Sequence, residues 1–185
     1  MRNLKHYEIE MLSAHVCIRT LKTENIHDAY ISGLNDPTIN YYLDNVARNH
    51  QTKASVKEFV QQSFDNEKEI LFGLWQSDVD KHCGTVRLHG IDDYHKTALI
   101  GVCIFDSSVW GKGVATEAIR LVTRWGLQDL GLRWIEAGVY EENVGSSMVF
   151  ERSGYSLKYS LIDKYLLNGQ PTTTRIYAAT SEDYV

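Results

Sequence analysis

The sequence predicts one mixed α/β domain that spans residues 1–185. Helical and strand-like hydrophobic periodicities follow one another with no linker, repeat or low-complexity tract between them. The elements come in the order strand, two helices, three strands, helix, strand, helix and two strands. Because the three successive strands read as a meander, the alternating strand–helix pattern of a doubly wound parallel sheet is excluded.

The bulk composition is that of an ordinary soluble globular protein. Hydrophobic residues make up 43% and charged residues 23% of the 185 residues, enough to bury a core in one domain. The net charge of −5 leaves no basic footprint for nucleic acid and is compatible with a cationic partner. The N-terminus has no apolar leader, and no apolar run reaches about 18 residues. We therefore expect a cytoplasmic protein that does not bind membranes.

The three cysteines, Cys17, Cys83 and Cys103, are far apart in apolar, strand-like surroundings. No Cys-x-x-Cys or Cys/His spacing indicates zinc, so we expect no metal site. We interpret the three as reduced thiols of the core, with a catalytic cysteine as the alternative.

The first half of the chain carries two helices and the meander. We expect a strand over 16–19, a helix capped by Thr23 and ended by Asp36-Pro37, and a helix that begins at the capping box Ser55–Glu58. Three strands follow, over 70–75, 84–91 and 98–105. The third is almost wholly apolar, which is typical of a central strand covered on both faces.

The second half begins with a glycine-rich turn and ends in a hairpin. We expect a helix over 114–130, a strand over 135–140, a short helix from Asn143 to the C′ glycine Gly154, and a hairpin of 155–167 and 172–179 around Asn168-Gly169.

The glycine-rich turn Trp110–Thr116 joins the apolar strand to the next helix. The first turn of a helix has unpaired N–H groups and a positive dipole end, and glycine lets a phosphate approach the backbone closely. A P-loop would need Ser or Thr directly after Lys112, and a Rossmann turn would need a third glycine or alanine at Thr116. A turn of this kind without any ligand is the alternative.

Three segments give the turn a context. The run Trp110–Ala118 resembles the acetyl-CoA loop of the GNAT superfamily of N-acetyltransferases, most closely the branch of ribosomal-protein N-terminal and spermidine acetyltransferases. Asn143–Ser146 and Gly154-Tyr155 are similar to the Asn-x-x-Ser…Gly-aromatic segment of that branch. The resemblance implies a central, mostly antiparallel sheet of six to seven strands flanked by about four helices.

The resemblance also implies direct acetyl transfer from acetyl-CoA to a primary amine, with no acyl-enzyme. The strands before and after the loop would splay apart and hold the pantetheine arm. The residues implied to bind the cosubstrate are Cys103, Ile104, Phe105, Trp110, Gly111, Lys112, Gly113, Val114, Ala115, Thr116 and Asn143. Asn143 is equally well explained as a helix N-cap.

The usual acid and base of such enzymes are missing. The position of the tyrosine acid is Phe150, so Ser146 is the substitute that the branch suggests. The position of the glutamate base is Leu99, and His89 is the first substitute because histidine titrates near neutral pH. Asp106, Glu136, Tyr165 and a chain of waters are further alternatives.

The acceptor amine stays open among an amino-sugar, a protein N-terminus and a polyamine or similar small amine. The elements that hold acceptors in this superfamily carry five tyrosines here, Tyr30, Tyr41, Tyr42, Tyr159 and Tyr165. A homodimer is compatible with the sequence. The competing function is a non-catalytic acyl-CoA-binding or interaction module, which Phe150 and Leu99 would explain.

Overall fold

The computed structural model describes residues 4–184. Its strands are β1 (Glu10–Leu12), β2 (Val16–Thr20), β3 (Ile70–Gln76), β4 (Lys81–Asp92), β5 (Thr97–Ile104), β6 (Trp134–Tyr140), β7 (Ser156–Leu167) and β8 (Gln170–Thr180). Its helices are α1 (Asp28–Leu34), α2 (Pro37–Asn40), α3 (Asp44–Ala47), α4 (Lys53–Phe64), α5 (Val114–Gln128) and α6 (Val144–Arg152), with 3₁₀ turns η1 (Thr23–Asn25) and η2 (Ser107–Val109).

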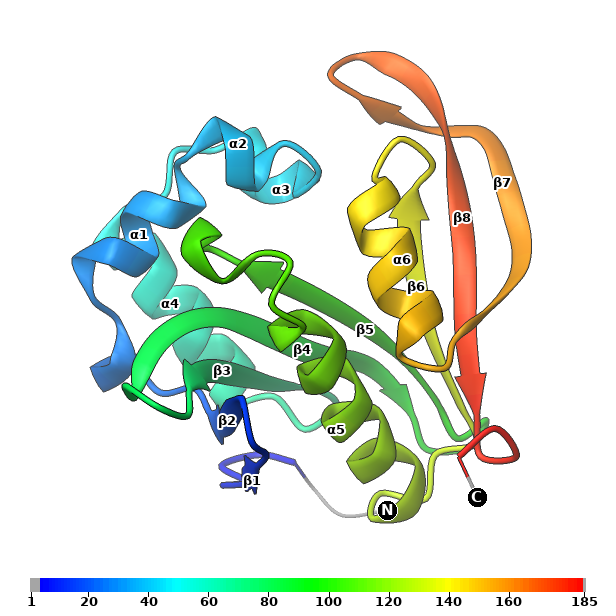
Figure 1. Ribbon diagram of the computed structural model, residues 1–185, viewed down its shortest axis with the longest axis horizontal. Coiled ribbons are helices and arrows are strands. Elements are labelled where there is room, and N and C mark those ends of the chain that lie inside the picture. Colours follow the sequence, from blue (N-terminus) through cyan, green and yellow to red (C-terminus); the bar gives the residue numbers. More distant parts are fainter. Residues whose placement is uncertain (1–3, 185) are drawn as a thin grey trace.

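The strands form one sheet in the order β1-β2-β3-β4-β5-β6-β8-β7 (Figure 1). Every neighbouring pair is antiparallel except β5 and β6, which are parallel. The predicted mixed and mostly antiparallel sheet is confirmed, with eight strands in place of six to seven. None of the helices in the described part of the chain is long and apolar enough to cross a membrane.

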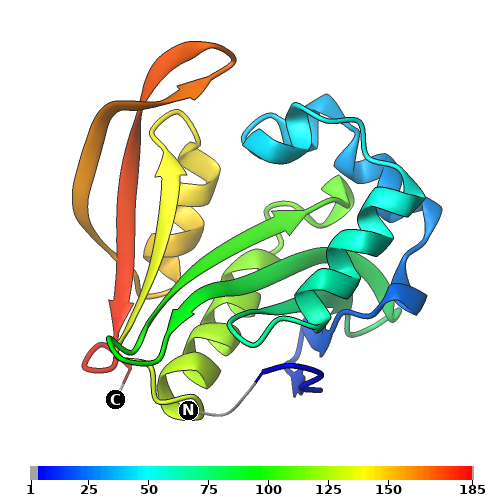
Figure 2. The same ribbon diagram turned by 180° about the vertical axis from the view of Figure 1, so that it is seen from behind.

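Helices cover both faces of the sheet, as the two opposite views show (Figures 1 and 2). Alternate strand residues such as Phe72 and Leu88 pack with α5 residues such as Val122 in the larger core cluster. On the opposite face, Leu71 and Trp75 pack with residues of α1 and α4 in a second cluster. The period-2 alternation of the strands therefore divides their side chains between two cores.

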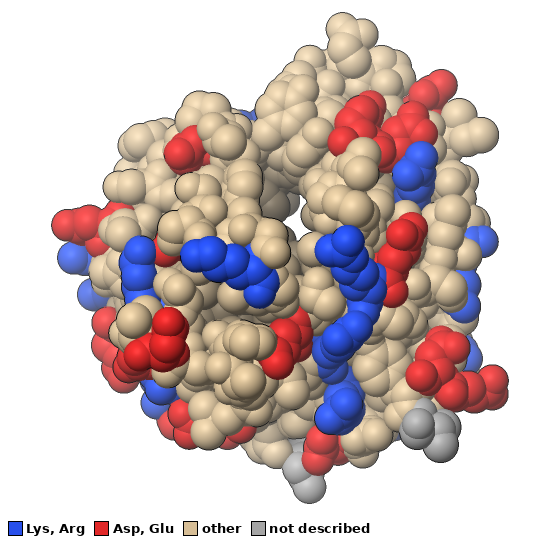
Figure 3. All heavy atoms as spheres, in the orientation of Figure 1, with Lys and Arg blue, Asp and Glu red and all other residues tan. Residues whose placement is uncertain are grey.

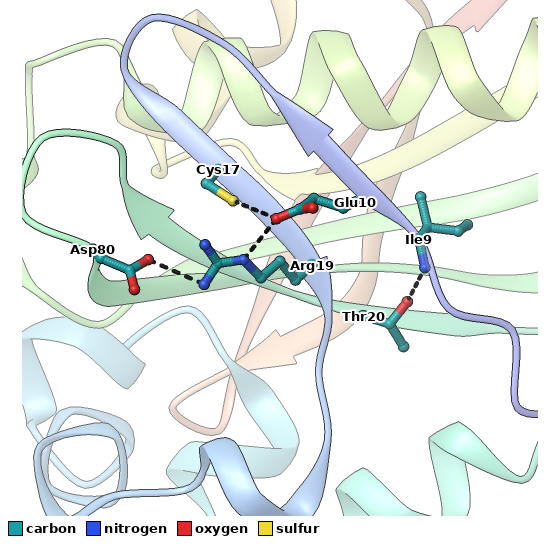
Figure 4. Close-up of polar contacts among 6 residues, drawn as sticks. All are labelled: Ile9, Glu10, Cys17, Arg19, Thr20 and Asp80. Carbon is teal, nitrogen blue, oxygen red and sulfur yellow. Dashed lines mark hydrogen bonds and ion pairs between the residues drawn. The ribbon is translucent and has the colours of Figure 1, made fainter.

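The short strand β1 is not predicted by the sequence, and polar contacts hold it to β2 (Figure 4). Glu10 pairs in register with Arg19, whose Nε donates to Glu10 Oε1 over 3.0 Å. The same guanidinium lies 3.0 Å from Asp80 Oδ1, and the amide of Ile9 donates to Thr20 Oγ1 over 3.0 Å. Ile9 and Met11 also pack against the larger core cluster, but a strand of three residues is too short for its alternation to stand out in the sequence.

Two predicted helix starts are wrong. Thr23 begins only the turn η1, and α1 begins after His27, whose side chain accepts a hydrogen bond from the amide of Tyr30. Helix α4 begins after Thr52, whose hydroxyl accepts from the amide of Ser55, so Ser55 is the last residue of the capping box (N3) rather than its first. In each case a residue close to the predicted one satisfies the free amides of the first turn.

The closing hairpin agrees with its prediction. Strands β7 and β8 meet at Asn168-Gly169, where both residues have positive φ, at 50° and 80°. That combination is the one a two-residue type I′ turn requires. Most residues of β7 are exposed, because the strand lies at the edge of the sheet.

We expect Gly33→Ala to destabilise the fold by about 1–3 kcal/mol, although alanine favours helix. A Cβ at Gly33 would lie 2.7 Å from Cβ and 2.9 Å from the carbonyl oxygen of Phe105, so α1 would be pushed off the end of β5. The measurement is urea unfolding. The matched control is Gly145→Ala in α6, where the nearest atom lies 3.8 Å from the added Cβ. Equal stabilities of the two variants would contradict the close approach of α1.

Candidate active site

The central feature of the site is a gap between β5 and β6. The two strands pair only where Thr97, Ala98 and Leu99 face Trp134, Ile135 and Glu136. Beyond this point β5 stays paired with β4 as far as Ile104, and β6 stays paired with β8 as far as Tyr140. Figure 1 shows the two strands diverging toward their carboxyl ends. The implied splaying of these strands is therefore present.

The gap corrects the interpretation of the apolar run 98–105 as a strand covered on both faces. Ala98 and Ile100 are buried, but Leu99 is 42% exposed and residues 101–104 are only partly buried. Their apolar side chains and unpaired backbone edge therefore line an open space. The unpaired edge covers Ile100–Ile104, so it includes three residues that the sequence did not single out.

The glycine loop lies at the open end of the gap. Asp106 caps η2 by accepting from the amide of Ser108 over 3.0 Å, and its other oxygen lies 2.6 Å from Lys81 Nζ. These contacts with Lys81 and Ser108 lower the pKa of Asp106, so its carboxylate holds the loop and is a poor base. Trp110 Nε1 donates to the carbonyl of Ile104 over 3.1 Å and ties the loop to the end of β5.

Both loop glycines have backbone conformations that side chains disfavour. Gly111 and Gly113 have φ of 74° and 82°, and a Cβ added to either would meet open space. Gly113 is the N-cap of α5, and the amide of Glu117 is the first to donate back, to the carbonyl of Gly113 over 3.0 Å. The amides of Val114, Ala115 and Thr116 therefore precede the helical ladder and are available to an anion. The amide of Lys112 is instead bonded within the turn, to the carbonyl of Val109.

The face that carries this loop is basic and hollowed. In Figure 3 the surface opens between the lobe of α1 to α4 and the lobe of α6, β7 and β8, and lysine and arginine side chains gather on both sides of the opening. The exposed cations of the loop, α5 and α6 are Lys112, Arg120, Arg124 and Arg152. A chain of net charge −5 thus presents local positive charge where the free amides lie. A pyrophosphate fits this donor set.

Two other predicted cosubstrate contacts have structural roles. The side chain of Phe105 is buried against Tyr30 of α1, with ring centroids 4.8 Å apart. Asn143 is the N-cap of α6, where its Oδ1 accepts from the amide of Ser146 over 3.1 Å. Cys103 and Ile104 lie on the unpaired edge of β5, as the resemblance implies.

A row of three residues lies across the sheet at the closed end of the gap. His89 on β4 pairs with Leu99 on β5, and Leu99 pairs with Glu136 on β6. Their neighbours Leu88, Ala98 and Ile135 belong to the core under α5, so the row faces the opposite side of the sheet. Burial, followed by the positive charge of Arg87, lowers the pKa of His89 and favours its neutral form.

Glu136 was only an alternative in the sequence, and the structure gives it defined contacts. Trp134 Nε1 donates to its Oε2 over 3.2 Å, and the hydroxyl of Tyr159 donates to its Oε1 over 3.4 Å. Partial burial and the adjacent charge of Glu136 raise the pKa of Tyr159. The sequence signal that could have marked Glu136 is its place two residues after Trp134 on the same face of a strand.

Phe150 has no acidic hydrogen to supply, and its ring is buried at 3% exposure against Tyr155 and Tyr177. Tyr155 is equally remote from chemistry, since its hydroxyl bonds Thr123 over 2.7 Å and burial raises its pKa. Ser146 lies in the first turn of α6, beside the open end of the gap, and is partly exposed. Tyr165 lies in the exposed part of β7.

The three cysteines are free, and burial raises the pKa of each thiol, to about 11 for Cys83 and about 12 for Cys103. Cys17 and Cys83 are buried, as expected of core thiols, whereas Cys103 is only partly buried and lies on the unpaired edge of β5.

A histidine pair attaches α1 to the sheet beside the gap. His27 Nε2 lies 3.2 Å from His82 Nδ1, and His82 Nε2 lies 3.0 Å from the carbonyl oxygen of Gly84. With both rings neutral and protonated at Nε2, His27 Nδ1 is free to accept from the amide of Tyr30. Burial, and next His27, lower the pKa of His82 to about 4.

The comparison with known proteins decides the family. The model of the acetyltransferase (GNAT) domain matches residues 15–156. The chain belongs to the GNAT acetyltransferase family. It is similar to the probable N-acetyltransferase YjcK of Bacillus subtilis (strain 168), with 38% identity over 96 residues. That match covers 51% of this chain and 52% of YjcK, so it spans about half of the relative.

Two solved GNAT structures share the fold. The spermidine N-acetyltransferase of Vibrio cholerae, in complex with CoA and spermine, superposes with a TM-score of 0.81 at 19% identity, covering 93% of this chain and 99% of that one. The ribosomal-protein-S5-alanine acetyltransferase of Vibrio fischeri gives a TM-score of 0.77 at 20% identity, covering 96% and 99%. The resemblance seen in the sequence is confirmed at the level of family and fold.

We expect the free energy of unfolding to fall as the pH is lowered from about 6.5 to about 4, because only the unfolded state protonates His82 in that window. For this one group the loss amounts to at most about 3 kcal/mol. Urea unfolding at a series of pH values measures it. His82→Phe should reduce the pH dependence of the free energy of unfolding by the share that His82 contributes, and His50→Gln, an exposed control, should leave it unchanged. An unaltered slope in His82→Phe would contradict the assignment.

Proposed function

We propose that residues 1–185 form one acetyltransferase domain that moves the acetyl group of acetyl-CoA directly to a primary amine. The observation that carries the proposal is the gap between β5 and β6, with the free amides of Val114–Thr116 at its open end. A ligand with an anionic group and a long, narrow, amide-bearing arm suits this combination. We also infer a cytoplasmic location, since free thiols are retained in reducing compartments.

The donor would lie along the gap. The amides of Val114–Thr116, the dipole of α5 and the cations around Lys112 would hold the pyrophosphate. The unpaired backbone of Ile100–Ile104 would bond the pantetheine amides, as one strand bonds another. The thioester would then lie further into the gap than the pyrophosphate, between Ser146 of α6 and Leu99 of β5.

Two side chains would carry out the proton transfers of the reaction. His89, favoured in its neutral form, would accept the proton that an amine must lose before it attacks. Ser146, at the start of α6, would donate to the sulfur of the leaving CoA. The acceptor remains one of the three classes that the sequence leaves open: an amino-sugar, a protein N-terminus or a small amine such as a polyamine.

The function is tested by incubating the protein with acetyl-CoA and a panel of these amines and following the release of free thiol. Turnover on one class supports the proposal and names the acceptor. If CoA raises the melting temperature but no amine is acetylated, the chain is a non-catalytic acyl-CoA-binding module. If CoA does not bind, both functions are refuted.

We expect Gly113→Ala to weaken CoA binding by at least about tenfold, because the αL conformation that aims the amides is strained for alanine. Gly131→Ala is the matched control, since Gly131 also has positive φ, 70°, with open space around an added Cβ. Both variants should lose about 1–2 kcal/mol of stability. Isothermal titration calorimetry should show weaker CoA binding in Gly113→Ala alone; equal affinities would refute the loop assignment.

Ser146→Ala should lower kcat about tenfold or more and leave CoA affinity nearly unchanged, because a proton donor acts on the leaving group. Ser147→Ala is its control, since the Ser147 hydroxyl is buried without a hydrogen-bond partner among the described residues. Steady-state kinetics measures kcat, and calorimetry measures the affinity for CoA. Equal kcat values for the two variants would remove Ser146 from the reaction.

A further inference from the structure

The carboxylate of Glu136 marks the closed end of the gap. Glu136 is the last residue of β6 that pairs with β5, and its partner there is Leu99. From this residue onward the strands diverge, so Glu136 lies where a ligand threaded along the gap must stop. Because its neighbours Ile135 and Ala137 belong to the core under α5, its side chain is on the opposite face of the sheet. The glycine loop leads directly into α5 and lies on the α5 side (Figures 1 and 2). A second substrate can therefore reach Glu136 without crossing the donor site.

The side chain is held in place by neutral donors. Trp134 Nε1 bonds one oxygen and the Tyr159 hydroxyl bonds the other. A carboxylate has about four lone-pair sites, so these two bonds leave capacity for a further donor. They also fix the rotamer, because the two donors come from β6 and from β7. Glu136 is thus oriented before any ligand arrives.

The carboxylate has no cationic partner among the ion pairs of residues 4–184. Lys158 lies close by, yet its ammonium is placed over the ring of Trp134, 5.3 Å from the centroid. A partly buried charge is normally compensated by a cation or by a metal. No group of three metal-ligating residues is found in the part of the chain that the structure describes. The carboxylate is therefore free to pair with a ligand that carries a positive charge.

We propose that Glu136 binds the protonated amine of the acceptor and makes the chain selective for amines that are cationic at neutral pH. This inference rests on the proposed function and adds the residue that recognises the acceptor. The amine would lie over Leu99, which is 42% exposed, between Glu136 and His89. At a strand spacing of about 4.8 Å, the backbones of Glu136 and His89 are about 10 Å apart, which leaves room for one small group between the side chains.

The proton balance follows from this placement. The ammonium bound at Glu136 gives up one proton to His89 or to solvent, and the neutral nitrogen bonds the carbonyl carbon of the thioester. The carbon–sulfur bond breaks, the nitrogen loses its second proton, and the thiolate takes one up. One proton is released for each acetyl group transferred. Glu136 is unchanged at the end of the cycle.

The test is Glu136→Gln, which keeps the shape and hydrogen-bonding capacity of the side chain and removes its charge. The matched control is Glu182→Gln, the same change at an exposed residue after β8. Each variant is assayed with an alkyl amine, charged at about pH 7.5, and with hydroxylamine, which is mostly neutral there. Thermal melting verifies folding, and calorimetry verifies CoA binding.

We expect Glu136→Gln to raise KM for the alkyl amine about tenfold to a hundredfold, the range for a lost charge-assisted hydrogen bond. CoA affinity and activity on hydroxylamine should change less than about threefold, and Glu182→Gln should match the wild type. An unchanged KM for the alkyl amine, or an equal loss on both acceptors, would overturn the inference. If the wild type acetylates no amine at all, it is the proposed function that fails.

Discussion

The site depends on one constraint, the pairing of β5 and β6 over only three residues. Backbone groups in a folded protein need hydrogen-bond partners, and beyond this short ladder the facing edges of the two strands have none from each other. The divergence is stable because each strand has a partner on its other side, β4 for β5 and β8 for β6. The result is an opening lined by backbone donors and acceptors inside an otherwise continuous sheet. A ligand that offers amides can complete the ladder.

The remaining elements hold the two sides of this opening in place. The side of β5 is attached to α1 through the close approach of Gly33 to Phe105 and through the neutral pair of His27 and His82. The side of β6 is backed by α6 and the closing hairpin, while α5 packs against the core between them. The free amides of α5 and Asn143 at the start of α6 both lie at the open end, because β5 and β6 run parallel. The row of His89, Leu99 and Glu136 lies at the other end, on the opposite face.

Local chemistry made much of this architecture predictable from the sequence. Residue preferences within a short segment determine the Asn168-Gly169 turn, the glycine loop and the periodic strands and helices. The predictions that were wrong have other causes. Strand β1 is only three residues long, and α1 is capped by a histidine ring. The apolar run of β5 was interpreted as doubly covered, whereas it lines the gap. Glu136 gained its importance from register with Leu99, a relation between distant segments that a single sequence does not display.

In the proposed function, the donor site is set by backbone geometry and the acceptor site by a few side chains on the other face. CoA should occupy the gap, and hydrogen–deuterium exchange with and without CoA tests this most directly. We expect slower exchange at the gap-facing amides of residues 100–104 and at the amides of Val114–Thr116, and unchanged exchange along the exposed edge strand β7. CoA binding that leaves the gap-facing amides of residues 100–104 unprotected would contradict this.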